Sequence, residues 1–581
     1  MIRKLARSIR QYKRDTILTP LSMTLEVIME VLLPIIMADL IDNGISAGNS
    51  AVIWRDGLLL AGVSILSLLS GLLGGVFGAR ASSGFARNLR HDMYYRLQDY
   101  SFSNIDKFST SSLITRLTTD VSNVQNAFQM LIRMAARSPL MLIFSVVMAA
   151  YMGGWLACTF AVVIPVLGAG LLLIGKKAMP AFHRVFRKYD RLNESIEENV
   201  RGMRVVKGFA REDYEKEKFG HGADSICEDF TKAEKIVAYN TPLMTFCMYF
   251  NMTVILLLGS FMAINGYGGV QIGQISALLT YGMQILMSLM MLSMIYVMIT
   301  MSTESAKRIC EVLSEVPDMP EAKNPVRTVP DGSVDFDHVS FKYAAQAKKF
   351  ALEDINLHIA SGMTVGILGG TGSSKSSLVQ LIPRLYDATE GTVRVGGRDV
   401  REYGIADLRD AVAMVLQKNL LFSGTIKENL RWGNPDATDA ELEEACRLAQ
   451  ADEFVRSFPD GYDTKIEQGG TNVSGGQKQR LCIARALLKK PKILILDDST
   501  SAVDTKTDAL IRAGFRTYIP ETTKIIIAQR VASVQDADLI VIMNNGKIDA
   551  MGTHAELLAN SPIYRETYEQ QTRGGADDEN N

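Results

Sequence analysis

The sequence has few residues of the kinds that build redox or metal centres. Its 581 residues include six cysteines and six histidines. No two cysteines form a C-x-x-C pair, and no cysteines and histidines cluster with the spacing of metal ligands. This scatter argues against a disulfide framework or a zinc site and favours reduced, buried thiols in a cytoplasmic or membrane protein.

An excess of charge of one sign is also lacking. Lysine and arginine total 62 and aspartate and glutamate total 63, which gives a formal net charge of −1. Because nucleic-acid binding depends on clustered positive charge, we expect no nucleic-acid partner. Nothing ahead of the first apolar run resembles a peptidase domain, so we do not expect this chain to process a secreted peptide.

Hydrophobic residues, by contrast, make up 47% of the chain. A helix needs about 20 mostly apolar residues to cross a bilayer. The first apolar stretch contains Glu26 and Glu30, which are tolerated where they face a bundle interior or a wet cavity. We therefore expect six membrane-spanning helices, at residues 16–40, 56–79, 138–155, 157–175, 241–265 and 274–300.

Basic residues set the expected orientation of these helices. Segments 80–137 and 176–238 are rich in lysine and arginine, whereas the other connections hold almost none. By the positive-inside rule both long segments are cytoplasmic, as are both termini, in a multi-pass protein of the plasma membrane. Residues 1–15 are expected to form an amphipathic helix on the cytoplasmic membrane surface. A signal peptide fits less well, because the apolar stretch that follows is too long and lacks a cleavage site.

The two long basic segments also have helical patterns, so they extend the spans into the cytoplasm. The turns at their tips, near residues 104–112 and 208–214, either contact a soluble domain or form solvated charged faces. The motifs in the second half of the chain favour contact.

The composition changes after Pro317, and a proline-punctuated linker over residues 317–333 leads to short, strand-like apolar runs. The buried strand Thr364–Leu368 runs directly into a glycine-rich loop and then a helix. In this context backbone N–H groups and the helix N-terminus bind phosphates, which outweighs the reading of a flexible turn. Lys375 should reach the outer phosphates of ATP, and Ser376 should hold Mg²⁺. The loop, hereafter the phosphate loop, consists of Gly369, Gly370, Thr371, Gly372, Ser373, Ser374, Lys375, Ser376 and Ser377.

An acidic pair ends another buried apolar strand, Ile493–Leu496. A carboxylate in that position suits a Mg²⁺ ligand acting partly through water, so we assign this role to Asp497. Asp498 follows, where an acid can orient an attacking water. Further motifs along the chain are Gln417, the run Ser474-Gly475-Gly476-Gln477, Asp504 at the end of the run that starts at Ser501, and Gln529.

In this order the motifs resemble an ATP-binding-cassette (ABC) domain. With six spans ahead of it, the chain resembles a bacterial exporter-type half-transporter over residues 1–570. The resemblance implies an all-α six-helix transmembrane domain over residues 16–316, followed by an α/β phosphate-loop nucleotide-binding domain over 334–570 with ATPase activity. The polar residues 571–581 are expected to form a disordered tail.

The resemblance also implies roles for single residues. Tyr343 would stack on adenine, Gln417 would link Mg²⁺ to the membrane helices, and Asp504 would lie across a dimer interface. The signature residues Ser474, Gly475, Gly476 and Gln477 would contact the γ-phosphate of ATP held by another subunit.

Three residues depart from the family pattern. Asp498 stands where the family has a catalytic glutamate, and its carboxylate is one methylene, about 1.5 Å, shorter. Gln529 replaces a histidine, and it can hydrogen-bond a phosphate but cannot act as a protonated donor. Ser374 replaces a glycine, and a side chain there disfavours a positive φ. The loop at residues 467–470 also lacks the usual acid–arginine pair.

The signature residues Ser474 to Gln477, by contrast, match the family pattern. In a head-to-tail dimer each site joins one chain's phosphate loop to the other chain's signature. The pattern therefore favours a heterodimer in which this chain supplies the degenerate site. A homodimer, an importer and an ATP-binding sensor with little turnover are alternatives, whereas the apolar spans exclude a soluble cassette ATPase.

The last two predicted spans are rich in methionine. Flexible thioethers suit an adaptable apolar pocket, although they also pack helices or face lipid. We expect ATP-driven, multidrug-type export of hydrophobic or amphipathic compounds, either drug-like or lipid-like. The residues are Met244, Met248, Met252, Met283, Met287, Met290, Met291, Met294 and Met298.

Overall fold

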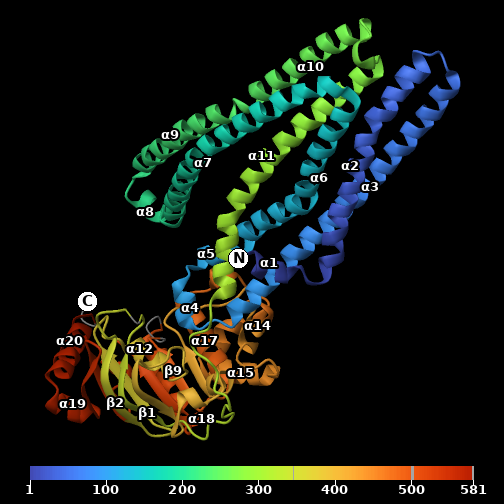
Figure 1. Ribbon diagram of the computed structural model, residues 1–581. Coiled ribbons are helices and arrows are strands. Elements are labelled where there is room, and N and C mark those ends of the chain that lie inside the picture. The colour runs from blue at the N-terminus through green and yellow to red at the C-terminus, as the bar shows by residue number, and fades with distance from the viewer. Residues whose placement is uncertain (345, 499–502, 579–581) are drawn as a thin grey trace. The chain divides into compact units, whose positions relative to one another are not determined.

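The computed structural model describes residues 1–344, 346–498 and 503–578, and the chain divides into two compact units. The first unit comprises Met1–Asp99 and Phe108–Glu315, and the second comprises Tyr100–Lys107 and the chain from Val316 onward. Figure 1 shows the long helices of the first unit and the sheets of the second. The first unit is therefore close to the predicted transmembrane domain, apart from a short piece that it gives up to the second.

The first unit is entirely helical among its described residues. Its elements are α1 (Ile2–Ala6), η1 (Arg7–Tyr12), α2 (Lys13–Asp39), η2 (Leu40–Ile45), α3 (Ser50–Gln98), α5 (Thr110–Thr115), η3 (Arg116–Asp120), α6 (Val121–Gly153), η4 (Gly154–Ala157), α7 (Cys158–Arg201), α8 (Met203–Gly208), α9 (Glu212–Val237), α10 (Asn240–Ile264), η5 (Tyr267–Gly269) and α11 (Ile272–Ser314).

Five continuous helical stretches among the described residues are long and apolar enough to cross a membrane. The third, Thr110–Arg201, is 92 residues long and holds two predicted spans, which Gly154 separates at a φ of +47°. Each predicted span lies within one of α2, α3, α6, α7, α10 and α11 apart from at most two residues, and α3, α6, α7 and α11 run well beyond the predicted ends. The helical transmembrane region is thus confirmed, and the count of six spans stays a prediction.

The N-terminal helix expected over residues 1–15 is wrong as a single element. The structure has α1 and η1 there, and Arg10 interrupts them with a φ of +42°. Arg10 and Ser8 donate hydrogen bonds to the carboxylate of Asp92 on α3, at 2.5 and 2.8 Å. These contacts with a residue about eighty positions along the chain favour a bend over a continuous helix.

The two acids of the first span lie against a neighbouring helix. Arg137 of α6 donates to Glu30 of α2 at 2.7 Å and lies 3.7 Å from Glu26. All three side chains are less than a third exposed. Because each charge has a partner, the cost of placing it among apolar helices is reduced.

Among its described residues, the second unit contains three sheets. The central one has six strands in the order β12-β11-β3-β10-β9-β6, and its neighbours are parallel except for the β11–β12 pair. A four-stranded antiparallel sheet has the order β2-β1-β4-β5, and β7 pairs with β8. The strands are β1 (Val334–Phe341), β2 (Leu352–Ile359), β3 (Thr364–Gly369), β4 (Glu390–Val395), β5 (Arg398–Asp399), β6 (Val412–Val415), β7 (Gly424–Thr425), β8 (Lys465–Ile466), β9 (Ile493–Asp497), β10 (Thr523–Ile527), β11 (Leu539–Asn544) and β12 (Lys547–Gly552).

Helices cover this unit and account for the rest of its regular structure. They are α4 (Phe102–Lys107), α12 (Lys375–Gln380), η6 (Val400–Glu402), α13 (Ile405–Ala411), α14 (Ile426–Arg431), α15 (Asp439–Leu448), α16 (Asp452–Ser457), η7 (Gly461–Asp463), η8 (Gln468–Gly470), α17 (Gly475–Leu488), α18 (Thr505–Tyr518), η9 (Val531–Ser533), α19 (His554–Asn560) and α20 (Pro562–Asp578).

The parallel strands of the central sheet are buried on both faces, whereas β12 at its edge is partly exposed. Along β9, Ile493 and Ile495 belong to one hydrophobic core, whereas Leu494 and Leu496 belong to the other. Successive side chains of a strand point to opposite faces, so an uninterrupted apolar run fills two cores at once. This explains why the run before the acidic pair is a strand.

One predicted cytoplasmic tip belongs to the second unit. The Tyr386 hydroxyl donates to Asp106 of α4 at 2.6 Å, and the ring of Phe102 lies 6.0 Å from that of Tyr386. Contact between this tip and the soluble unit is confirmed. The other tip, near residues 208–214, lies in the first unit, and its contact with a soluble domain stays a prediction.

The disordered tail expected from residue 571 is wrong for the described residues, because α20 continues to Asp578. A helix that has already formed extends at low cost, so a polar segment can prolong it. Residues 579–581 of the predicted tail lie outside the described residues.

Candidate functional site

The carboxyl ends of four adjacent parallel strands meet at one edge of the central sheet. The phosphate loop follows β3, the acidic pair ends β9, and Gln529 and Gln417 lie two residues beyond β10 and β6. Ligands of open parallel sheets bind at this edge. A cavity of about 310 Å³ lies there. Its lining consists of Thr371, Gly372, Ser373, Ser374, Lys375, Ser376, Ser377, Gln417, Asp497, Asp498, Ile527 and Gln529.

The phosphate loop has the backbone that its glycine pattern predicts, with a serine at the critical position. Ser374 has a φ of +70° and a ψ of +25° and precedes the first residue of α12. A side chain in this left-handed region costs roughly 1–2 kcal/mol. The predicted conflict between Ser374 and a positive φ is therefore present in the structure.

Lys375 lies within the loop, and its ammonium donates to the carbonyl oxygens of Gly369 and Gly370, both at 2.8 Å. Burial lowers the pKa of Lys375, and the carboxylates of Asp498 and Asp497 oppose that shift. A partly desolvated cation beside the N-terminus of α12 attracts an anion strongly, because little water screens it.

Two oxygen ligands lie side by side at the base of the cavity. The Ser376 hydroxyl donates to Asp497 Oδ1 at 3.0 Å. Burial raises the pKa of Asp497, and the Ser376 hydrogen bond opposes that shift. Mg²⁺ prefers oxygen ligands and binds through one or two protein groups together with phosphates, so this pair fits it. Gln417 lines the same cavity. The roles of these three residues toward Mg²⁺ stay predictions.

Asp498 and Gln529 form a hydrogen-bonded pair. Gln529 Nε2 donates to Asp498 Oδ2 at 2.8 Å, and Gln417 Nε2 lies within 3.4 Å of the same oxygen. Two of the residues that depart from the family pattern therefore touch each other. An amide that donates to the carboxylate restricts the position of that carboxylate.

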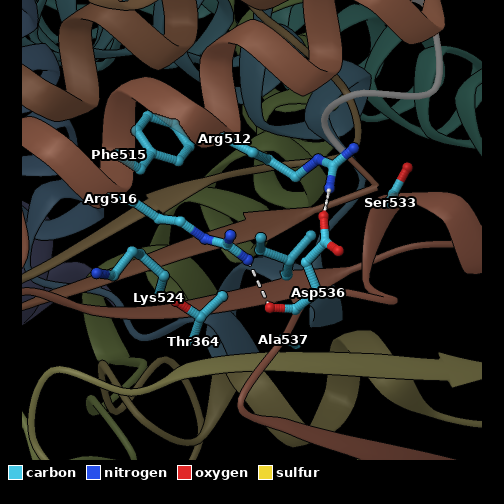
Figure 2. Close-up of a pocket in the computed structure, with 9 residues that line it drawn as sticks. Thr364, Arg512, Phe515, Arg516, Lys524, Ser533, Asp536 and Ala537 are labelled. Carbon is cyan, nitrogen blue, oxygen red and sulfur yellow. Dashed lines mark hydrogen bonds and ion pairs between the residues drawn. The ribbon is translucent and has the colours of Figure 1, made fainter. Parts of the chain in front are cut away.

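The segment after β10, residues 529–537, is attached to α18. The Ser533 hydroxyl donates to Asp508 at 3.1 Å, and Arg512 pairs with Asp536 at 3.3 Å. Figure 2 shows Arg512 and Arg516 of α18 directed at Asp536, whose carbonyl oxygen accepts from Arg516 at 2.5 Å. These polar contacts fix one side of the segment that carries Gln529.

Tyr343 lies outside the lining of this cavity and is 49% exposed. Its hydroxyl is 2.8 Å from that of Ser377, and its ring meets that of Tyr386 edge-on at 5.2 Å. The structure thus places the predicted adenine-binding ring beside the phosphate loop and against the tyrosine that contacts α4. Stacking on adenine stays a prediction.

The signature run forms the start of α17. The Ser474 N–H donates to the Gln477 side chain at 2.9 Å, and the Gln477 N–H donates to Ser474 Oγ at 3.3 Å. This capping box satisfies the backbone N–H groups of Ser474 and Gln477, and Ser474 and Gly475 are exposed. The signature residues do not line the cavity of this chain's phosphate loop, and their contact with ATP on another subunit stays a prediction.

Asp504 caps α18 by accepting from the Thr507 N–H at 2.9 Å. That hydrogen bond is the main cause that lowers the pKa of Asp504. Ser501 and Ala502, from the same motif, lie outside the described residues. Placement of Asp504 across a dimer interface stays a prediction.

Motif reasoning missed three residues around the site: Tyr386, Ser533 and Gln571. Gln571 of α20 bonds to the backbone of Gln529 and Val531. None of the three belongs to a local motif, so only their long-range partners identify them.

We predict that Ser374→Gly stabilises the second unit. Glycine removes the penalty of a side chain at φ +70° but loses more entropy on folding, which leaves a net gain of roughly 0.5–1 kcal/mol. The change should raise the melting temperature of this unit in the intact protein.

Asn545→Gly is the matched control, because Asn545 has a φ of +48° and asparagine tolerates that region. A melting temperature that falls in Ser374→Gly, or rises equally in both variants, would contradict the assigned strain.

The comparisons with known proteins cover both units. The chain matches the family model described as ABC transporter transmembrane region over residues 16–289 and the one described as ABC transporter over residues 352–501. It is 35% identical over 549 residues to the uncharacterized ABC transporter ATP-binding protein YfiB of Bacillus subtilis, covering 94% of this chain and 95% of that protein.

A second relative has a more specific name, and one solved structure resembles the whole chain. The fatty acid ABC transporter ATP-binding/permease protein of Mycobacterium bovis is 33% identical over 476 residues, or 82% of this chain and 75% of that protein. The structure of a bacterial Atm1-family ABC exporter with ATP bound superposes with a TM-score of 0.80 at 24% identity, covering 97% of this chain and 98% of that one. At that identity the likeness shows the fold.

Proposed function

The chain belongs to the ABC transporter family, and from this premise we propose that it is the degenerate-site half of a heterodimeric exporter of hydrophobic or amphipathic compounds. Its exporter-type transmembrane region is fused to an ATPase-type nucleotide-binding domain. In the proposed orientation both termini and the nucleotide-binding domain are cytoplasmic.

One observation carries the proposal. Within the same cavity the groups that bind ATP are complete, whereas the groups expected to hydrolyse it depart from the family pattern. The phosphate loop, Lys375, Ser376 and Asp497 supply what ATP binding needs. The acid next to Asp497 is the short Asp498, and it accepts a hydrogen bond from Gln529. A site built in this way favours retention of ATP over its hydrolysis.

The residues act as follows in this proposal. Lys375 and the backbone N–H groups at the start of α12 bind the phosphates. Ser376 and Asp497, with Gln417, would hold Mg²⁺, which neutralises charge on the phosphates. Asp498 is the group that orients the attacking water, and it does so poorly because its carboxylate lies about 1.5 Å short. Gln529 donates to Asp498 and cannot supply a positive charge.

The partner subunit is proposed to complement this pattern. The exposed start of α17 offers an intact signature to ATP on the partner, where hydrolysis proceeds normally. This division of labour supports a heterodimer over a homodimer, because two copies of this chain would impair both sites.

Two observations support an amphipathic substrate. A cavity of about 720 Å³ in the first unit combines apolar side chains, among them Phe182, Met298 and Met301, with polar and charged ones such as Asn126, Arg187 and Asp190. The Mycobacterium bovis relative is named for fatty acid transport. We propose lipid-like molecules with an acyl chain as the first substrates to examine, ahead of drug-like ones.

A nucleotide-retention experiment tests the proposal. The chain is tagged, purified from native membranes with whatever binds it, placed in lipid nanodiscs and loaded with labelled ATP. After a chase with unlabelled ATP, we expect one labelled ATP per complex to remain while the complex completes many turnovers.

The subunit composition of the purified complex and the direction of transport complete the test. A second half-transporter in a one-to-one ratio supports the heterodimer, whereas this chain alone with two equally slow sites overturns it. Little turnover with every added lipid indicates a sensor. Movement of a labelled acyl compound toward the side that carries the nucleotide-binding domains indicates an importer.

A further inference from the structure

Gln571, a side chain of the C-terminal helix, holds the segment that carries Gln529. Gln571 of α20 accepts from the Val531 N–H at 2.8 Å and donates to the Gln529 carbonyl oxygen at 2.9 Å. Both halves of one carboxamide are thus used on the backbone of residues 529–531. The direct neighbour Gln570 instead donates to Glu566 of its own helix at 3.2 Å.

The helix that carries Gln571 is fixed by other contacts. Tyr564 of α20 is 1% exposed, and its hydroxyl lies 2.6 Å from Nδ1 of His554 on α19. Arg565 donates to the carbonyl oxygens of Leu558 and Ala559 at 2.8 and 2.6 Å. Because these contacts attach α20 without Gln571, that side chain is free to serve the loop.

The segment that Gln571 holds, residues 529–531, is connected to the carboxylate of Asp498 through Gln529. Gln529 donates through its side chain to Asp498 and accepts through its backbone from Gln571. On the other side, Ser533 and Asp536 are fixed by α18. The backbone of residues 529–536 is therefore held at both ends, which limits where it can place the Gln529 side-chain amide.

We propose that Gln571 is a positioning residue that locks residues 529–531 and thereby sets the Gln529–Asp498 contact, so that α20 regulates how long this site keeps ATP. The expected effect on ATP retention rests on the proposed function, whereas the anchoring of residues 529–531 by Gln571 does not. Displacement of α20 releases the backbone of Gln529 and loosens the site without altering a residue that touches phosphate.

The test compares Gln571→Ala with Gln570→Ala in the intact nanodisc complex. Each hydrogen bond contributes a few-fold to the equilibrium that holds the loop, so loss of both should raise hydrogen exchange of residues 529–534 by about 10-fold. Release of labelled ATP from this site should accelerate by a similar factor. Gln570→Ala should leave both rates unchanged.

Gln571→Glu separates the two hydrogen bonds. Its carboxylate still accepts from the Val531 N–H but cannot donate to the Gln529 carbonyl oxygen, so an intermediate effect is expected. Equal exchange in the Ala variants overturns the proposal, and so does raised exchange with unchanged ATP release. If the unmodified complex retains no labelled ATP, the proposed function fails, and the exchange comparison still decides whether Gln571 holds the loop.

Discussion

Asp498→Glu is expected to raise ATP hydrolysis at this chain's own site by about 10- to 100-fold. The extra methylene carries the carboxylate about 1.5 Å further into the cavity, and a misplacement of about 1 Å costs about 100-fold in rate. Residue 498 has a φ of +48°, a region that aspartate tolerates better than glutamate, and this offsets part of the gain. The measurement is steady-state ATP turnover by the assembled complex.

The rise in ATP turnover must be assigned to this chain's own nucleotide site rather than to the partner's. Ser474→Ala serves as the background, because we expect it to silence the site whose phosphate loop belongs to the partner. In a heterodimer the Ser474→Ala/Asp498→Glu double variant should still gain turnover, whereas in a homodimer both sites lose their signature and no gain appears. Asp498→Asn is the control and should give no rise. An unchanged or lower rate in Asp498→Glu would show that Asp498 does not limit hydrolysis.

Ser474→Ala alone should lower hydrolysis at the partner's site by about 100-fold. Loss of one preorganised donor to a developing negative charge typically costs that much. The variant should leave ATP binding at Lys375 unchanged, because Ser474 does not line the cavity around that residue. Turnover is measured in the complex, and binding at this chain's site by retention of labelled ATP.

The same change also removes a helix cap, which costs about 1 kcal/mol. Thr438→Ala is the matched control, since Thr438 and Glu441 form the same kind of capping box at the start of α15. It should reduce stability by a similar amount without affecting turnover. Normal turnover in Ser474→Ala, or an equal loss in Thr438→Ala, would remove the signature assignment.

The sequence predicted the parts of the site that short-range rules determine. An apolar run that ends in a carboxylate becomes a buried strand, as in β9, because both faces of a parallel sheet are covered. The positive φ at Ser374 follows from the glycine pattern of the loop. Since parallel strands place their carboxyl ends together, motifs more than a hundred residues apart meet in one cavity.

Short-range rules do not predict contacts between residues that are far apart in the sequence. The bend at Arg10 depends on Asp92, and the anchoring of residues 529–531 depends on Gln571. In both cases a polar side chain bonds to a group far away along the chain, and no local sequence pattern indicates that partner. The assignment of α4 to the second unit likewise depends on Tyr386.

The placement of α4 has a mechanical consequence. The chain passes between the two units at three points only among the described residues, at 99–100, 107–108 and 315–316. Any rotation of one unit against the other must concentrate its dihedral changes at these three junctions. Substitutions that restrict the backbone there, and that keep the hydrogen bond from the Asp99 N–H to the Tyr95 carbonyl oxygen at the end of α3, should slow the transport cycle and leave both units folded.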